Sequence, residues 1–284
     1  MVAENNKSQQ DLKSHMDSLF DFSSRIPYQK SHFITTLQAA KSLIGINPKK
    51  PPEQMLKWIE SYISRYSDNI GNENQASNTK KLEIITIEEF AKLVNKNEKL
   101  LALDYVRKLH LVASPQYLAE YILELSLDRS ASHVLFCWYI YKSLKNIKDE
   151  GKLFFLELGV NCLFDNDLKI KNADFIILCF FREILDTIYI RYSTVYPLLM
   201  QLLLSLKIKC EKEESYYLEK EIGPFIKYDR EFGLLSFLAT LKKDEYSSEM
   251  IIQLDAIRSL IKYSSNNKCF TYKEIINSNL EYNA

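Results

Sequence analysis

The chain has 284 residues, of which 46% are hydrophobic and 12% are aromatic; this is enough apolar material for one large or two modest packed domains, and it excludes a disordered protein. Its 37 Lys and Arg residues balance 37 Asp and Glu residues, so the chain lacks the positive field of a general nucleic-acid-binding protein. Only six glycines and seven prolines occur, which favours long helices joined by short turns. The composition therefore predicts an all-α protein.

Three helices and a polar segment are predicted in the first third of the chain. Residues 10–22 place apolar side chains at the spacing of one helical face, and Pro27 ends this helix. A second helix is expected over residues 31–44, and a third follows the next pair of prolines. Residues 67–81 are rich in Asn and Ser and nearly free of apolar side chains, which is typical of a flexible linker.

Helix-start signals divide the middle of the chain. Thr86 and Glu89 have the spacing of a capping box, in which the Thr86 side chain accepts from the Glu89 backbone while the Glu89 side chain reaches back. Ser114, which is followed by a proline, has the form of an N-cap with proline at the first helical position. The helices predicted here cover residues 100–112, 116–127, 132–144 and a stretch that Gly151 precedes and that runs to about 164.

The last third of the chain continues the helical pattern. Because each pair of helices leaves an apolar face that its neighbour must cover, we expect stacked antiparallel helix pairs, an α-solenoid of the HEAT or armadillo type. A short repeat agrees with this architecture, since Ser31-His32 and Ser132-His133 are each followed, ten residues after the serine, by Lys-Ser-Leu. The helices predicted in this part cover residues 174–192, 196–209, 229–241 and 247–263.

These signals divide the chain into five segments. The polar linker has too few apolar side chains to offset the ordering of its backbone, which costs roughly 1–2 kcal/mol per residue. A charged stretch and a Gly-Pro pair separate the last helices from those before them. The segments are N-terminal helices at 1–66, the linker at 67–81, a helical repeat domain at 82–209, a C-terminal helical segment at 210–263 and a loose tail at 264–284.

The cysteines and the termini predict a cytoplasmic protein. No C-x-x-C pair occurs, so the cysteines are interpreted as reduced thiols. No secretory signal or lipidation motif is recognised, and the most apolar run, residues 175–181, is far shorter than the roughly 18 residues of a membrane span. Any membrane contact is therefore expected to be peripheral. The basic pairs at 49–50 and 80–81 are interpreted as solvated loops in preference to a lipid head-group patch. The cysteines are Cys137, Cys162, Cys179, Cys210 and Cys269.

Catalytic and cofactor-binding motifs are missing from the sequence. The closest two glycines, Gly151 and Gly159, are eight residues apart, so neither the dinucleotide-binding nor the P-loop glycine pattern can occur. The sequence also lacks G-x-S-x-G, D-F-G and H-R-D. We therefore assign no catalytic, cofactor-binding or metal-binding residue from the sequence, and we expect no cofactor.

The four histidines leave one alternative open. None of them forms H-E-x-x-H or a Cys/His metal-binding spacing. His32 and His133 occupy equivalent positions in the short repeat, and they would form a metal site if they met near Glu120 or Glu124 on the preceding helix. That arrangement would suit a helical metal-dependent oxidoreductase. Hydrogen bonding at a helix start or between helices is the simpler interpretation of both histidines.

Residues 118–144 carry the most informative pattern: an apolar helical face, a short polar break and a second apolar helix centred on Trp138. This region resembles the helical accessory domain of phosphoinositide kinases, where a leucine-rich helix is followed by a polar turn and by a helix with a leucine-x-x-tryptophan core. Residues 98–109 and 152–157 resemble the flanking helices of that domain. The residues that fit the two central helices are Leu118, Ile122, Leu123 and Leu125 in the first, and Leu135, Trp138, Tyr139 and Tyr141 in the second.

A further match lies near the end of the chain. Residues 229–241 and 251–260 look like the helical segment that precedes the kinase core in the type III beta phosphatidylinositol 4-kinases. The motifs of the catalytic lobes are absent from this sequence, so we expect no kinase activity from the chain on its own.

The resemblance implies a function based on packing. It implies a non-catalytic scaffold that positions a kinase core and binds membrane-recruiting protein partners, of the small GTPase or Golgi-adaptor class, in phosphoinositide signalling. It also implies a cytoplasmic protein that is peripheral on Golgi-type membranes. The main alternative is a helical-repeat interaction adaptor unrelated to lipid kinases.

Overall fold

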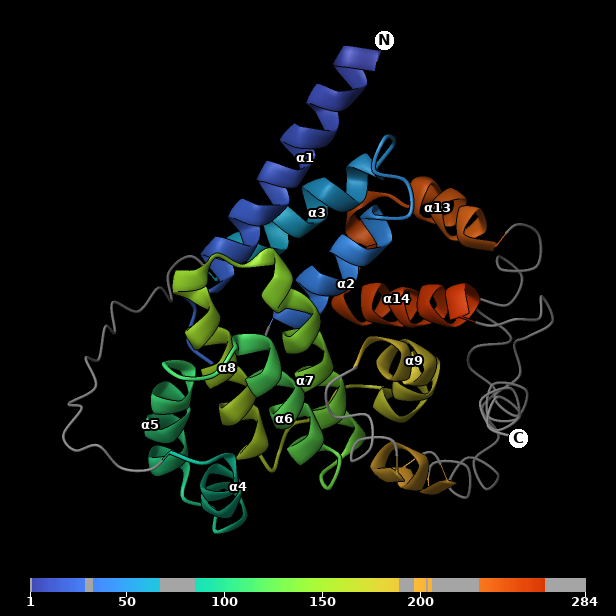
Figure 1. Cartoon of the computed structure of the whole chain (residues 1–284). Coiled ribbons are helices and arrows are strands. Elements are labelled where there is room, and N and C mark those ends of the chain that lie inside the picture. The colour runs from blue at the N-terminus through green and yellow to red at the C-terminus, as the bar shows by residue number, and fades with distance from the viewer. Residues whose placement is uncertain are drawn as a thin grey trace. The chain divides into compact units, whose positions relative to one another are not determined.

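The computed structural model describes residues 2–28, 33–66, 85–188, 197–202, 204–205 and 230–263. Every regular element in these ranges is a helix, which confirms the predicted all-α class for this part of the chain (Figure 1). Residues 67–81, predicted as a linker, and residues 264–284, predicted as a tail, lie outside these ranges. None of the described helices combines the length and the apolar character needed to cross a membrane.

The helices before residue 67 end close to the predicted positions, but the first begins at Val2, eight residues before the predicted start at residue 10. The first ends before Pro27, and Met16 and Phe20 on its predicted apolar face are buried. The third begins directly after the Pro51-Pro52 pair, because proline cannot donate a backbone hydrogen bond and favours the first turn of a helix. These helices are α1 (Val2–Ser23), α2 (Ile34–Ile44) and α3 (Glu53–Ser64).

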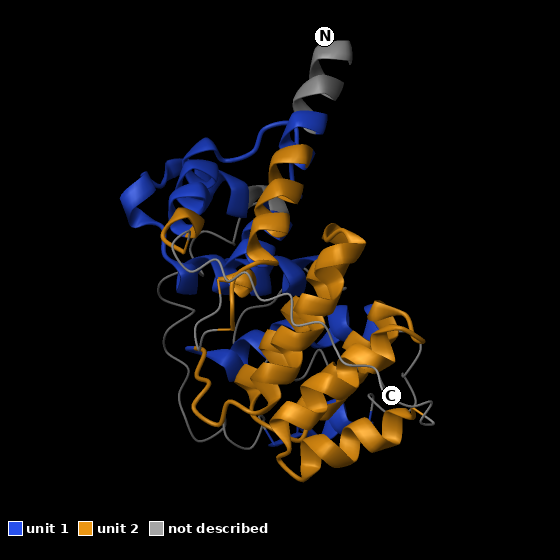
Figure 2. Ribbon diagram, turned by 90° about the vertical axis from the view of Figure 1, so that its left-hand side faces the viewer, with its two compact units in different colours: residues 1–13, 36–62, 171–284 blue, residues 14–35, 63–170 orange. Residues whose placement is uncertain are grey.

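The chain divides into two units, each made of segments that are distant in the sequence (Figure 2). The division into five segments predicted from the sequence stays a prediction. Unit 1 combines Met1–Lys13, Thr36–Tyr62 and Lys171–Ala284, and unit 2 combines Ser14–Thr35 and Ile63–Ile170.

Unit 2 is built around α7, in which every residue of Ala131–Ser143 is buried. A helix without a polar face is stable only when other elements cover it on all sides. Helices α6 and α8 pack on α7 and on each other, while α5 packs on α8 and α4. The helices of this unit are α4 (Ile87–Asn95), α5 (Lys99–His110), α6 (Pro115–Ser126), α7 (Ala131–Ser143) and α8 (Asp149–Leu163), with a 3-10 turn, η2 (Leu144–Asn146), after α7.

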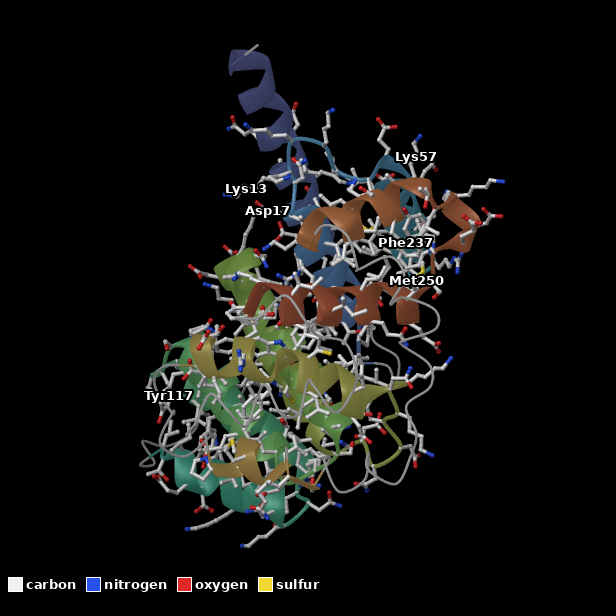
Figure 3. All side chains as sticks on the ribbon, turned by 90° about the vertical axis from the view of Figure 1, so that its right-hand side faces the viewer. Lys13, Asp17, Lys57, Tyr117, Phe237 and Met250 are labelled. Atoms are coloured by element: carbon white, nitrogen blue, oxygen red, sulfur yellow. The ribbon has the colours of Figure 1, made fainter. Side chains whose placement is uncertain are left out.

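The start of α6 confirms the predicted cap. The Ser114 hydroxyl accepts a hydrogen bond of 3.2 Å from the backbone N–H of Tyr117, and Pro115 occupies the first helical position. The Tyr117 side chain, labelled in Figure 3, is half-buried. A serine cap satisfies one of the backbone donors that a helix start leaves without a helical partner.

Two glycines allow close contacts with α8. Gly151 was expected to precede this helix, but it lies in its first turn. A Cβ atom at Gly151 would lie 2.8 Å from Cγ2 of Ile147 and 3.1 Å from the Ser24 side chain. At Gly159 it would lie 3.0 Å from Cγ2 of Ile122 on α6. The missing side chains therefore let α6 and the segment after α1 approach α8.

Unit 1 is organised around the pair α9 (Ala173–Thr187) and α14 (Ser248–Tyr263), which pack against each other. Because this pair joins residues as far apart as Glu183 and Arg258, the described contacts do not establish a solenoid, in which neighbouring repeats stack in order. The HEAT-like or armadillo-like arrangement stays a prediction. Helix α13 (Arg230–Thr240) packs on α14, and a 3-10 turn, η3 (Lys243–Glu245), lies between them in the chain.

Aromatic and polar contacts join α3 and α13 to Tyr246, which lies just before α14. The Trp58 ring of α3 stacks on Tyr62 at 5.0 Å and lies 6.1 Å from the Tyr246 ring. The Tyr246 hydroxyl donates to the main-chain oxygen of Leu238, which ties the start of α14 to α13. Lys57 lies on the solvent side of α3 (Figure 3).

Candidate functional site

The polar residues at the start of α7 form the first group whose side chains could take part in a reaction. His133 is buried, and both of its ring nitrogens have partners. Nδ1 lies 2.7 Å from the Ser130 hydroxyl, and Nε2 lies 3.1 Å from the main-chain oxygen of Asp165. A carbonyl oxygen only accepts, so Nε2 carries the proton and the Ser130 hydroxyl donates to Nδ1.

The pKa of His133 agrees with this neutral tautomer. Burial lowers the pKa of His133 from its ordinary value, and the positive charge of Arg129 acts in the same direction. The bond to the Asp165 carbonyl and the Asp165 charge oppose burial with smaller effects. The imidazole is therefore held in the form that makes both hydrogen bonds.

The segment after α8 is held by further hydrogen bonds besides the one from His133. The Tyr28 hydroxyl donates to Oδ2 of Asp165 at 2.8 Å, and the Tyr28 ring packs edge-on against Phe136 at 5.8 Å. Burial raises the pKa of Tyr28, with the neighbouring Cys162 and Asp165 adding to the effect, so its phenol remains a neutral donor. The Ile170 backbone N–H donates to the Ser132 hydroxyl at 2.9 Å. Together these bonds hold the segment against the start of α7.

The Ser130–His133 pair has the two parts of an activated nucleophile, but its geometry serves the helix. Catalytic serines are paired with a base that a third group orients. Here the serine is the N-cap of α7, the histidine follows three residues later, and the third group is the carbonyl that closes the Asp165 segment. The pair is therefore best explained as a helix-start contact that also holds two segments together.

A second polar group lies along α7 toward its end. Tyr141 donates to Oε1 of the buried Glu120 on α6 at 2.9 Å, and burial raises the pKa of Tyr141 to about 12. The Trp138 ring stacks on Tyr141 at 5.6 Å, with 14° between the ring planes. The Lys142 ammonium lies 5.6 Å from the centre of the Trp138 ring, within the range of a cation–π contact. These groups join α6 to α7 and face the interior.

The metal site considered from the sequence does not come together in the described part of the chain. His32 lies outside the described residues. His133 uses both nitrogens in hydrogen bonds, and Glu120 accepts from Tyr141. No cluster of three or more His, Cys, Asp or Glu residues suited to a metal ion occurs among the described residues.

The thiols near α7 lie inside the protein. Cys137 and Cys162 face each other across α7 and α8, and burial raises the pKa of Cys162 well above its ordinary value. Cys179 on α9 is buried as well. The raised pKa makes the Cys162 thiol a poor nucleophile, and all three buried cysteines pack as small apolar side chains. Cys210 and Cys269 lie outside the described residues.

Sequence reasoning did not identify the buried charges of unit 1. Nε of Arg258 lies 2.8 Å from Oδ1 of Asp255, and Nη2 of Arg258 lies 3.3 Å from Oε2 of Glu183 on α9. All three side chains are at most 10% exposed. The signal in the sequence was the Asp–Arg spacing of three residues within α14. Glu183 could not be assigned to this cluster because it belongs to a distant helix.

Comparisons with known proteins identify no relative. No protein-family model, no curated protein and no solved structure matches this chain. The residues that fit the phosphoinositide kinase pattern, among them Leu118, Leu135 and Trp138, are buried core residues of α6 and α7. The family resemblance therefore rests on the sequence pattern alone and stays a prediction.

Proposed function

We propose that this chain is a non-catalytic helical scaffold that acts through protein contacts. The observation that carries this proposal is the use of polar groups around α7. His133, Tyr28 and Tyr141, which have the chemistry for proton transfer, are engaged in hydrogen bonds that hold helices and segments together. Side chains that are buried and bonded in this way maintain a shape rather than contact a substrate.

The more specific proposal is the one that the sequence pattern implies: an accessory region that positions the core of a phosphatidylinositol 4-kinase and binds its membrane-recruiting partners. It is supported by the order of α6, a short turn and α7, with Trp138 in the interior. A block of this kind would supply a rigid surface, and a few aromatic or aliphatic anchors would supply most of the affinity.

The first experiment is a phosphorylation assay with phosphatidylinositol and ATP. We expect no turnover by the purified chain, because the sequence contains no phosphate loop and no catalytic-base motif. A Trp138→Ala preparation, in which the fold is expected to be damaged, controls for contaminating kinase. Turnover that follows the intact chain and is lost with this variant would contradict the non-catalytic proposal.

The second experiment measures binding to a type III beta phosphatidylinositol 4-kinase core from which the helical region has been removed. Biolayer interferometry should detect saturable binding by the intact chain, and a protein-kinase core serves as the matched negative control. Absence of binding to the lipid-kinase core would contradict the accessory-region proposal. Equal binding to both kinase cores would contradict it too, and would favour an adaptor unrelated to lipid kinases.

A further inference from the structure

Helix α5 and the two residues after it carry an unusual set of exposed apolar side chains. Leu100 is 81% exposed, Leu101 56%, Leu111 71% and Val112 69%. Only one other large hydrophobic residue in the described part of the chain, Leu204, is comparably exposed. The sequence predicted an ordinary amphipathic helix here, but apolar side chains at both ends of α5 face solvent. Such a concentration marks an interaction surface.

Four exposed apolar side chains and two half-buried charged ones form a single stripe. At 3.6 residues per turn, the apolar pairs at the two ends of α5 and the charged residues between them fall within about 120° of the helix circumference. The opposite face packs inside unit 2, where Ala102, Val106 and Leu109 are buried, and α5 lies beside α8 and α4 (Figure 1). We call this stripe the α5 face; its residues are Leu100, Leu101, Asp104, Lys108, Leu111 and Val112.

The α5 face is complementary to itself. Its residues lie in pairs at equal distances from position 106, so Leu100 corresponds to Val112, and Asp104 corresponds to Lys108. Leu101 corresponds to Leu111 in the same way. In an isologous two-fold contact, residue i of one copy meets residue j of the other, and j meets i. Two antiparallel α5 helices would therefore place apolar ends against apolar ends, and each Asp104 against Lys108 of the second copy.

We propose that the α5 face is a self-association surface, which pairs antiparallel with the α5 face of a second copy of this chain. Charge complementarity selects this occupant and this direction. A parallel pair would place the two Asp104 side chains together and the two Lys108 side chains together, and like charges in register disfavour association. Within one chain the Lys108 ammonium lies 2.9 Å from Oδ2 of Asp104, and the antiparallel contact would set the same two charges against each other between the copies.

The charged neighbour of the face does not disturb the pattern. Arg107, next to Lys108 in the sequence, is turned to the edge, where its Nε lies 2.5 Å from Oε1 of Glu157 on α8.

Two facing stripes of six side chains form a contact at the low end of specific interfaces, below about 1,200 Å² in total. The dimer should therefore be reversible, with a dissociation constant in the micromolar range.

Sedimentation velocity on the full chain, over about 1 to 200 μM, tests the proposal through charge reversal. Asp104→Lys places a positive charge opposite Lys108 of the second copy, and Lys108→Asp places a negative charge opposite Asp104. Each variant alone should self-associate at least about tenfold more weakly than the wild type. An equimolar mixture of the two variants should regain dimerisation to within about threefold of the wild type, because each then faces opposite charges.

Two further variants complete the test. Leu111→Glu should abolish the dimer through its apolar contact, while circular dichroism should show unchanged helix content because the residue is exposed. Lys92→Glu, in the exposed Lys92–Glu89 pair of α4, is the matched control and should leave self-association unchanged. A wild-type chain that stays monomeric at all concentrations would overturn the proposal, whether the face is then covered by another segment, bound by another partner or left in water. Failure of the mixed variants to associate would overturn the antiparallel pairing.

Discussion

The backbone N–H of Thr86 donates a hydrogen bond of 3.0 Å to the hydroxyl of Tyr105, nineteen residues later on α5. The sequence predicted that the Glu89 side chain would accept from this N–H as half of a capping box. The other half forms as predicted, with the Thr86 hydroxyl accepting from the Glu89 backbone at 3.3 Å. The Glu89 carboxylate lies 3.2 Å from the Lys92 ammonium. The start of α4 is thus completed by a contact with a neighbouring helix.

This arrangement predicts unequal effects of two substitutions at the α4 start. Tyr105→Phe removes the acceptor of a backbone donor and should lower the free energy of unfolding by about 1 kcal/mol. Glu89→Ala removes an exposed ion pair and should change it by less than about 0.5 kcal/mol. Urea denaturation followed by circular dichroism measures both values. A larger loss for Glu89→Ala than for Tyr105→Phe would contradict this prediction and would support the full capping box.

Trp138 should be the most sensitive core position of α7. Its side chain is fully buried and stacks on Tyr141, so its truncation leaves a large cavity. We expect Trp138→Ala to lower the free energy of unfolding by about 3–5 kcal/mol. Lys92→Ala, at an exposed position of α4 in the same unit, is the control and should cost less than about 0.5 kcal/mol. A cost below about 1 kcal/mol for Trp138→Ala, measured by urea denaturation, would contradict the core assignment.

Removing one member of the buried charge cluster of unit 1 should lower the free energy of unfolding more than replacing all three members together. Arg258→Met leaves Glu183 and Asp255 buried without their cation and should cost about 3–5 kcal/mol of unfolding free energy. Replacing all three by apolar residues of similar size should recover most of that loss. The exposed Lys171–Glu249 pair of the same unit supplies the control, since Lys171→Met should cost less than about 1 kcal/mol. Thermal unfolding of the four proteins would show the order, and a triple variant as unstable as Arg258→Met would contradict it.

His133 should make stability depend on pH near neutrality. Its pKa in the folded chain lies below the ordinary value of 6.5, mainly through burial, so the unfolded chain binds a proton more readily. The contribution of His133 to the free energy of unfolding is therefore fully present above about pH 6.5 and falls as the pH drops toward the folded pKa. Below the folded pKa this contribution no longer changes with pH. The slope from one such histidine is at most about 1.4 kcal/mol per pH unit.

The test compares pH slopes rather than absolute stabilities, because His133→Asn also changes two hydrogen bonds. Between pH 5 and 7 the variant should show a shallower slope than the wild type in urea denaturation. His110 adds a second contribution to the pH dependence of stability, since burial and the Lys152 charge lower the pKa of His110 too. The double variant His110→Asn/His133→Asn should be shallower still. Parallel curves for wild type and His133→Asn would exclude a role of His133 in the pH dependence.

The candidate site could be predicted only where its bonds are local. Ser130 and His133 belong to one helix start, and a helix-start hydrogen bond was the simpler interpretation of this histidine. The second partner of His133 and the partner of Tyr28 are both supplied by Asp165, at separations of 32 and 137 residues. Such partners are chosen by the packing of helices, which short-range patterns do not specify.

The sequence by itself determined where most helices begin and end, through signals such as Pro27, Ser114 and the apolar run around Trp138. These signals act over a few residues, because caps, prolines and apolar spacing change the stability of one helix directly. Only the tertiary structure decided that Glu183 meets Arg258, and that Leu100 and Leu111 stay exposed while Val106 is buried. An apolar side chain favours burial but does not select its partner; that choice is made when whole helix faces pack together.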